Sequence, residues 1–300
     1  MAFPQVICFG EILWDLLLTG KVAGGAPMNV AFHLNQLGVP SSMISRVGND
    51  EDGREILDFL QGKQVSADFV QLDNDHPTGT VKVTLNDDGH PQYDIVQNVA
   101  WDFIATTPVA IDAVRQTRAF VFGSLVARIP TSQNTLFEMI ENAPFRVFDV
   151  NLRKPFFSKE LIFGLLPKAN MVKMNDEELE IIASWFGFNG TENEKMIQVK
   201  KACKIDVLLV TRGENGAISL TGTGFCSHEG YRVHVKDTIG SGDAFLAGYL
   251  SQYLHQASPE KCIDFACKTG AYVATKRGGT PVHDTREITN LSQKAIKINI

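Results

Sequence analysis

Short apolar runs separated by amphipathic segments dominate the chain. Six runs of strand length, each bounded by polar or turn residues, predict buried strands. They are QVICFGEIL from Gln5, SSMISRV from Ser41, RAFVFGSL from Arg118, FRVFDVNL from Phe145, NMVKMN from Asn170 and DVLLVTRG from Asp206. Between these runs, apolar residues recur at helical spacing, for example at Val30, Leu34 and Leu37.

This alternation predicts the doubly wound α/β class, in which helices cover both faces of a mainly parallel sheet. Ligands of such folds bind at the carboxyl ends of the strands. A second helical pattern, at Leu179, Ile182, Ala183 and Phe186, fits the same scheme.

One segment, residues 78–97, breaks the alternation. In TGTVKVTLNDDGHPQYDIVQ, Val81, Val83 and Leu85 alternate with polar residues before a turn at Asn86 to Gly89 and a second extended run. The pattern predicts a β-hairpin with one apolar face. Because no helix separates its strands, we expect the hairpin to project from the main sheet, either as a lid beside a ligand site or as an edge decoration.

Composition and charge narrow the class of ligand. The 300 residues are 44% hydrophobic and 21% charged, as expected for one large globular domain or a domain with a small addition. A net charge of -6 argues against a protein that grips nucleic acid by neutralising phosphates. A small soluble ligand is the better expectation.

The cysteines and the N-terminus point to a reducing compartment. The five cysteines form no C-x-x-C pair, so they predict neither a disulfide framework nor a zinc site. The N-terminus lacks the pattern of a signal peptide, and no window reaches the ~18 apolar residues of a membrane span. We therefore expect a cytoplasmic protein without a membrane partner.

The stretch DTIGSGDAFLAGYL, residues 237–250, carries the strongest chemical signal. The preceding VHVKD alternates as a strand does, and apolar residues recur at helical spacing from Ser241, so Gly240 to Gly242 are predicted at a strand-to-helix turn. Free backbone N–H groups at a helix start, with no Cβ in the way, favour a phosphate. Asp243 is then placed to accept a proton from a hydroxyl group that attacks the phosphorus. The alternative is an ordinary helix start with a favourable carboxylate.

A second glycine cluster, GGAPMNVAFHLNQLG from Gly24, suits recognition of a polyol. Gly24 and Gly25 allow close backbone approach, and Asn29 offers a donor and an acceptor to a hydroxyl group. Asp15 could supply a carboxylate. The same residues also fit a tight packing turn before a core helix. The chain has neither G-x-x-x-x-G-K-[ST] nor G-x-G-x-x-G after its first strand, so P-loop and dinucleotide enzymes are not supported.

Together, these motifs resemble those of a known family. GGAPMNVAFHLNQLG with VGNDEDG, from Val47, resembles the N-terminal signature of the ribokinase-like (PfkB-type) carbohydrate kinases, and DTIGSGDAF resembles their C-terminal signature. Ser241 stands where alanine is usual. The resemblance implies a ribokinase-like fold with a small projecting β-sheet lid, in one domain over residues 1–300 with lid strands near 12–23 and 78–101.

The resemblance also implies roles for further residues. FDVNLR looks like the family's D-x-N-x-R segment, which implies that Arg153 lies near the transferring group. The expected catalytic residues are therefore Asp243, Arg153 and the anion hole of Gly240, Ser241 and Gly242. KMNDEEL looks like the K-x-N-x-x-E segment, which implies that Asn175 and Glu178 organise Mg²⁺ through water. From the residues alone, Asn175 to Glu178 also fits a capped helix start. The nucleotide would contact Asn175, Thr211, Gly213, Gly216, Gly240 and Gly242.

Within the family, GEIL, GGAPMNVA, FGSL and DVNLR resemble fructokinases more than ribokinases. The expected reaction is therefore ATP-dependent phosphorylation of D-fructose to fructose 6-phosphate, with the sugar held by Asp15, Gly24, Gly25, Asn29 and Gln97. A 2-keto-3-deoxygluconate kinase or ribokinase of the same family, and a non-catalytic sugar or nucleotide sensor, are the alternatives. The resemblance further implies a monovalent cation such as K⁺ near Asp237 and Gly279, and the apolar face of the lid favours a homodimer.

Overall fold

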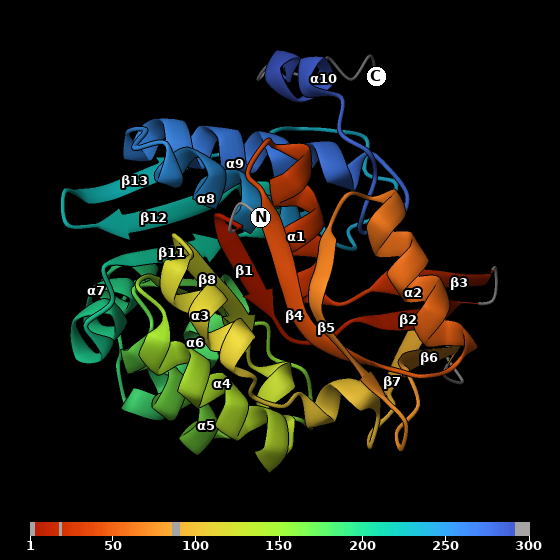
Figure 1. Cartoon of the computed structure of the whole chain (residues 1–300). Coiled ribbons are helices and arrows are strands. Elements are labelled where there is room, and N and C mark those ends of the chain that lie inside the picture. Colours follow the sequence, from red (N-terminus) through yellow and green to blue (C-terminus); the bar gives the residue numbers. More distant parts are fainter. Residues whose placement is uncertain (1–3, 18–19, 86–90, 292–300) are drawn as a thin grey trace.

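The computed structural model describes residues 4–17, 20–85 and 91–291, without the side chains of residues 83–85 and 91–93. Within these residues, the main sheet has nine strands in the order β13-β12-β11-β10-β9-β8-β1-β4-β5 (Figure 1). Their bounds are β1 Val6–Phe9, β4 Ser41–Gly48, β5 Ser66–Asp73, β8 Ala119–Gly123, β9 Arg146–Asp149, β10 Met171–Asn175, β11 Val207–Thr211, β12 Ala217–Thr221 and β13 Gly224–His228.

The strands from β11 to β5 pair in parallel, and β12 and β13 add an antiparallel edge. All six apolar runs form strands of this sheet, because parallel strands are buried on both faces and so read as continuous apolar sequence. In β1, Ile7 and Phe9 pack into one core cluster, whereas Val6 and Cys8 pack into the other. The strands β5, β12 and β13 were not predicted.

The strand predicted at VHVKD is wrong. Residues 233–237 pair with no strand of the sheet. Instead, the backbone N–H groups of Lys236 and Asp237 both donate to the carbonyl oxygen of Ala274, at the end of a helix. Alternation alone could not show this, because an extended segment beside a helix can alternate in the same way.

Helices cover both faces of the sheet, as the alternating pattern predicts, so the predicted fold class is confirmed. One layer consists of α1 Ala26–Gln36, α2 Glu51–Gly62, α8 Ser241–Leu254 and α9 Pro259–Ala274, with α10 Thr285–Asn290 packed against α9. The opposite layer consists of α3 Pro108–Gln116, α4 Pro130–Asn142, α5 Lys159–Leu165, α6 Asp176–Phe186 and α7 Glu192–Cys203. Short 3₁₀ helices lie at η1 Ala100–Phe103, η2 Leu125–Arg128, η3 Leu166–Lys168 and η4 Gly213–Asn215.

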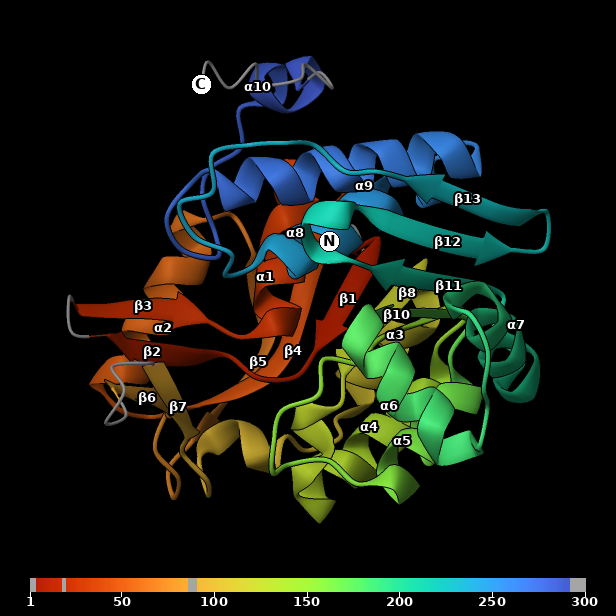
Figure 2. The same ribbon diagram turned by 180° about the vertical axis from the view of Figure 1, so that it is seen from behind.

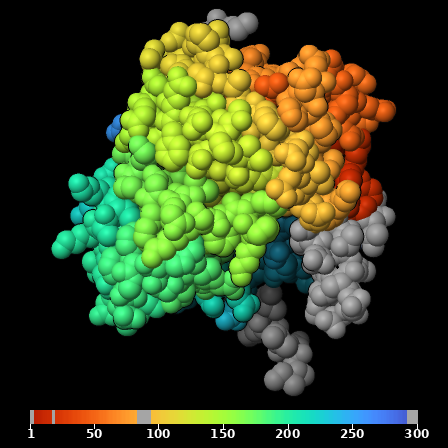
Figure 3. Space-filling model, turned by 90° about the horizontal axis from the view of Figure 1, so that it is seen from below, coloured from red at the N-terminus to blue at the C-terminus, as the bar shows by residue number. Residues whose placement is uncertain are grey.

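A smaller sheet projects from the side of the main sheet (Figure 2). In the described residues it has four strands, in the order β3-β2-β6-β7, with bounds β2 Leu13–Leu17, β3 Gly20–Gly24, β6 Gly79–Leu85 and β7 Pro91–Ile95. β6 and β7 pair antiparallel, as the hairpin pattern predicts, and the turn predicted at Asn86 to Gly89 lies outside the described residues. Seen from below, orange and amber atoms lie between the red atoms of the N-terminal segment and the yellow-green atoms from the middle of the chain (Figure 3).

The lid sheet is tied to the body at two places. The indole N–H of Trp14 donates to the carbonyl oxygen of Asp52 at 3.0 Å, and Lys21 forms ion pairs with Asp52 and Glu55 of α2. Where the chain leaves β7, the Arg128 guanidinium donates to both carboxylate oxygens of Asp102, at 2.7 and 2.8 Å. These contacts fix the base of the lid.

Two observations concern the expected reduced cysteines and the expected absence of a membrane span. All five cysteines lie within the described residues, their thiols are free, and four of them are buried. In the described part of the chain, no helix has both the length and the apolar character needed to cross a bilayer.

Candidate active site

The first turns of α1 and α8 meet at Asp243. Gly240 caps α8 with φ +73°, the left-handed region that glycine adopts most readily. Asp243 lies three residues further on, and its Oδ2 accepts a hydrogen bond of 2.8 Å from Nδ2 of Asn29 on α1. The predicted anion turn and the predicted polyol-binding cluster, 214 residues apart, therefore share one site.

The surroundings of Asp243 suit a proton acceptor. The pKa of its carboxyl group is raised to about 6, first by burial and then by the nearby charge of Asp149. Lys173, the hydrogen bond from Asn29 and Arg153 act in the opposite direction. A carboxyl group with this pKa is ionised at neutral pH and more basic than an exposed one, as a general base requires.

Beneath the glycine turn lies a buried ion pair. Its two residues begin the quoted motifs D-x-N-x-R and K-x-N-x-x-E, but sequence reasoning gave neither of them a role. Nζ of Lys173 lies 3.0 and 3.2 Å from the two carboxylate oxygens of Asp149, and the residues are 7% and 3% exposed. A Cβ atom on Gly242 would lie 3.1 Å from the same Nζ, so the glycine lets the turn approach the ammonium group. Burial lowers the pKa of Lys173, but Asp149, Glu178 and Asp243 outweigh it and hold the pKa above its usual value.

The available signal for this pair was a charged residue inside each of two apolar strands, in FRVFDVNL and NMVKMN. Buried charges are rare unless they are paired, so two of them on strands that become neighbours indicate a functional site. The strand order that makes β9 and β10 neighbours is a property of the fold.

The candidate sugar-binding residues Asp15, Gly24, Gly25 and Asn29 lie where β2 and β3 meet α1. A Cβ atom on Gly24 would lie 2.5 Å from Oδ2 of Asp15, so the carboxylate rests on this glycine. Gly25, with φ +116°, caps α1, and a Cβ there would lie 2.3 Å from the carbonyl oxygen of Glu11. Burial raises the pKa of Asp15 to about 6, against the charge of Arg153.

Glu11 is a second buried carboxyl group that sequence reasoning missed, although it is the glutamate of GEIL. It is 2% exposed, and its Oε2 has no hydrogen-bond partner among the described residues. Burial raises its pKa to about 7.

Arg153 is exposed, but its positive charge lowers the pKa of three carboxyl groups, those of Glu11, Asp15 and Asp243. The guanidinium group is therefore close enough to act on all three acids electrostatically. Gln97 differs from the other candidates: it is exposed beyond the end of β7, and within the described residues it forms no hydrogen bond with them.

The candidate nucleotide-binding residues gather at the ends of β10 and β11. Asn175 and Thr211 are paired across these strands. Asn175 Oδ1 accepts from the backbone N–H of Glu178, and Glu178 Oε2 accepts from that of Asn175, which is a capping box for α6. Glu178 Oε1 accepts from the backbone N–H of Leu152. The helix-start interpretation is thus observed, and the metal role of these residues stays a prediction.

The two glycines after β11 have different surroundings. Gly216 has φ +79°, and a Cβ there would lie 1.9 Å from the carbonyl oxygen of His228, so no other residue fits this close approach. Gly213 has φ +54°, and a Cβ there would have no neighbour within 4 Å, so this glycine faces open space.

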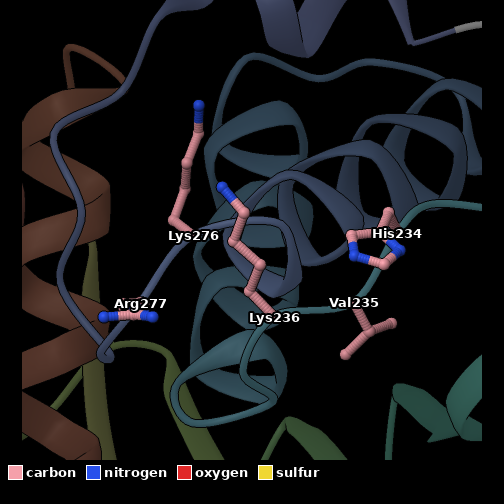
Figure 4. A pocket seen from close by; sticks show the side chains of 5 residues that line it. All are labelled: His234, Val235, Lys236, Lys276 and Arg277. Atoms are coloured by element: carbon pink, nitrogen blue, oxygen red, sulfur yellow. The ribbon is translucent and has the colours of Figure 1, made fainter.

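The two residues expected at a monovalent cation also come together. The carboxylate of Asp237 accepts from the backbone N–H groups of Ile239 and Gly278, each at 3.0 Å, which ties the turn before α8 to the turn that carries Gly279. Beside these turns lies a cavity of about 510 Å³ (Figure 4). Its lining is mainly basic: His234, Val235, Lys236, Lys276 and Arg277.

Among the described residues, no group of three or more histidine, cysteine, aspartate or glutamate side chains is arranged to hold a metal ion. A metal ion in this site would therefore need ligands from a bound phosphate or from water, which is how Mg²⁺ usually binds.

The structure therefore brings the glycine turn at the start of α8, the Asp243 carboxyl group with its raised pKa and the amide group of Asn29 into one site. Residues 17–286 match the family described as pfkB family carbohydrate kinase, and the chain belongs to that family. The protein is a carbohydrate kinase.

Several similar proteins are named as fructokinases. The chain is 28% identical over 309 residues to Fructokinase-2 of Solanum habrochaites, with 93% of each chain covered. The fold is similar to that of a fructokinase from Xylella fastidiosa solved with bound ATP, with a TM-score of 0.86 and 23% identity over 96% of this chain and 98% of that one. It is also similar to a fructokinase from Vibrio cholerae O395 solved with fructose, ADP and calcium ion, with a TM-score of 0.82 and 25% identity over 96% and 99%.

Proposed function

We propose that this carbohydrate kinase transfers the γ-phosphoryl group of ATP to the 6-hydroxyl group of D-fructose. The observation that carries the proposal is the hydrogen bond of 2.8 Å between Asn29 and Asp243, which joins the polyol-binding cluster to the helix start with the glycine turn. A sugar hydroxyl group bound beside Asn29 would be within reach of the Asp243 carboxylate. The names of the similar proteins favour fructose among the sugars.

In this mechanism, Asp243 accepts the proton of the attacking hydroxyl group. The backbone N–H groups of Gly240 and Gly242 and the ammonium group of Lys173 beneath them stabilise the negative charge that develops on the phosphoryl group. The N–H group of Ser241, predicted to join them, already donates to the carbonyl oxygen of Thr238. Asp15 and Asn29 orient the sugar, because a carboxylate and an amide can satisfy hydroxyl groups that both donate and accept. Arg153 offsets the charge of the clustered carboxylates.

The residues present fit ATP with Mg²⁺. The glycine turn leaves room for phosphate oxygens where a Cβ atom would otherwise stand, and Lys173 supplies a buried positive charge that nucleotide phosphates would compensate further. Asn175 and Glu178 would hold Mg²⁺ through water, since both oxygens of Glu178 already accept backbone N–H groups. When bound, Mg²⁺ neutralises charge on the phosphates.

A monovalent cation at Asp237 and Gly279 is part of the proposal. It would share the Asp237 carboxylate with the N–H groups of Ile239 and Gly278, and would stiffen the turn before α8. Rates measured at equal ionic strength in KCl and in tetramethylammonium chloride test this. Equal rates in the two salts would remove the cation from the proposal.

A homodimer through the lid is also proposed. Within the described residues, β3 and β7 are the two edge strands of the lid sheet, and Val22 of β3 is 37% exposed. Unpaired strand edges are ready to pair with a second copy. Sedimentation of the full chain would decide, because a monomer at micromolar concentration contradicts the dimer.

The experiment that tests the reaction is ADP release with Mg-ATP and a panel of D-fructose, D-ribose, 2-keto-3-deoxygluconate and adenosine. We expect turnover with fructose and a loss of several orders of magnitude in kcat in Asp243→Asn. Turnover on another sugar would correct the substrate and keep the mechanism. Unchanged turnover in Asp243→Asn would refute the assignment of the base.

A further inference from the structure

Two buried histidines join helix α1 to the turn that carries Gly279. His33 is fully buried on α1, one turn after Asn29, so both side chains lie on the same face of the helix. Its Nε2 lies 2.9 Å from the carbonyl oxygen of Gly279, and its Nδ1 lies 2.8 Å from Nε2 of His283. The mechanism above uses neither histidine.

The geometry fixes where the protons of both rings lie. A carbonyl oxygen only accepts, so Nε2 of His33 carries hydrogen and donates to Gly279. The neutral ring then has an acceptor at Nδ1, and Nε2 of His283 must donate to it. The result is a directional chain from His283 through His33 to the carbonyl group of Gly279. Burial lowers the pKa of His33 to about 3 and that of His283 to about 4, in keeping with two neutral rings.

The carbonyl group at the end of this chain lies against the site. A Cβ atom on Gly240 would lie 2.6 Å from both Cα and O of Gly279, so the start of the anion turn rests directly on this backbone. A Cβ atom on Gly279 would lie 3.1 Å from Nδ2 of Asn29, the atom that donates to Asp243. The Gly279 backbone is thus packed between the anion turn and the partner of the general base.

We propose that His33 is a positioning residue for phosphoryl transfer: it holds the Gly279 backbone in place beneath Gly240 and beside Asn29, and His283 fixes its tautomer. The proposal rests on the proposed roles of the Gly240–Gly242 turn and Asp243. A small displacement of Gly279 would move the N–H groups that hold the phosphoryl group, and such displacements reduce the rate more than the binding of substrates.

Three variants separate positioning from stability. His33→Leu removes the donor and keeps an apolar side chain, whereas His33→Gln keeps an N–H group that can reach the carbonyl. Asn35→Ala is the matched control, because Asn35 lies on the same helix and bonds to Ala31 and Ser41, away from the site. All three are assayed for kcat and KM with the sugar that the wild-type enzyme phosphorylates, per amount of folded protein.

We expect kcat of His33→Leu to fall about tenfold or more, with KM for the sugar within about twofold of the wild-type value. His33→Gln should recover most of kcat, and Asn35→Ala should keep kcat even where its melting temperature falls. A His33→Leu enzyme with wild-type kcat, or a loss of kcat as large in Asn35→Ala, would overturn the inference. An inactive wild-type enzyme would instead refute the proposed function.

A second measurement needs no variant to fold. Nitrogen-15 NMR of histidine-labelled wild-type protein distinguishes the two neutral tautomers. We expect both His33 and His283 to carry hydrogen on Nε2 at neutral pH. Hydrogen on Nδ1 of His33 would break the directional chain and overturn the inference.

Discussion

Replacing Lys173 by methionine tests the electrostatic core of the site. The change keeps the length of the side chain and removes its charge, so Asp149, 3% exposed, loses the ammonium group 3.0 Å from its Oδ1. Breaking a buried ion pair on one side costs about 3–5 kcal/mol, because the remaining charge stays buried without compensation. For a chain of 300 residues, an unfolding entropy of about 0.6 kcal/mol per degree converts this cost into a fall in Tm of about 5–8 °C.

The same substitution should move the pH dependence of kcat. Lys173 lowers the pKa of Asp243, whereas Asp149 raises it. In Lys173→Met, the pKa of Asp243 therefore rises above about 6, and the acid limb of kcat moves to higher pH. In the double variant Lys173→Met with Asp149→Leu, both charges are absent, so the limb should move back and most of the lost stability should return.

The assay combines thermal unfolding of each variant with pH-rate profiles of kcat. Lys168→Met is the matched control: its ion pair with Glu141, at 2.6 Å, joins side chains that are 37% and 65% exposed. Exposed pairs of this kind contribute about 0–1 kcal/mol, so its Tm should change little. A Lys173→Met protein with wild-type Tm, or a double variant as unstable as the single one, would refute this account of the buried pair.

Three further results are expected. Asp243 must be ionised to accept a proton, and its pKa is raised to about 6, so kcat should fall about tenfold per pH unit below pH 6. A pH-rate profile in which kcat falls only below about pH 4, the range of an unshifted carboxyl group, would contradict this. Gly240→Ala should lower both kcat and Tm, because the new Cβ would meet the Gly279 backbone. Gly38→Ala is the control: φ is similar and a Cβ there meets nothing within 4 Å, so this protein should lose only about 1–2 kcal/mol of stability to left-handed strain. Equal losses of Tm and kcat in the two variants would show that contact with Gly279 is unimportant. Removing divalent metal with EDTA should abolish turnover until Mg²⁺ is restored, and Glu178→Gln should require more Mg²⁺ for half-maximal rate; an unchanged requirement would remove Glu178 from the metal site.

Local patterns were enough to find most strands of the main sheet and the β6–β7 hairpin. Apolar runs such as NMVKMN are parallel strands because both faces of the main sheet are covered. The alternation in TVKVTL marked β6, in which Val81 is buried and Lys82 is exposed. The turn chemistry of Gly240 to Gly242 and the helix from Ser241 could also be predicted, since φ at Gly240 and the first turn of α8 depend on adjacent residues. The extended segment VHVKD was misjudged, because whether such a segment joins a sheet depends on which element lies beside it.

What the sequence determined by itself is therefore most strands of the main sheet, the class of fold and the residues that carry the family's motifs. Only the tertiary structure decided which of these residues share a site. Asn29 and Asp243 touch because α1 and α8 pack together on one face, and Lys173 reaches Asp149 because β9 and β10 are neighbours in the sheet. The same holds for the histidine chain, in which residues 250 positions apart bond to each other. A sequence records the identity of such groups, but burial, the pKa of Asp243 and the tautomer of His33 depend on the distances and the exclusion of water that the folded chain creates.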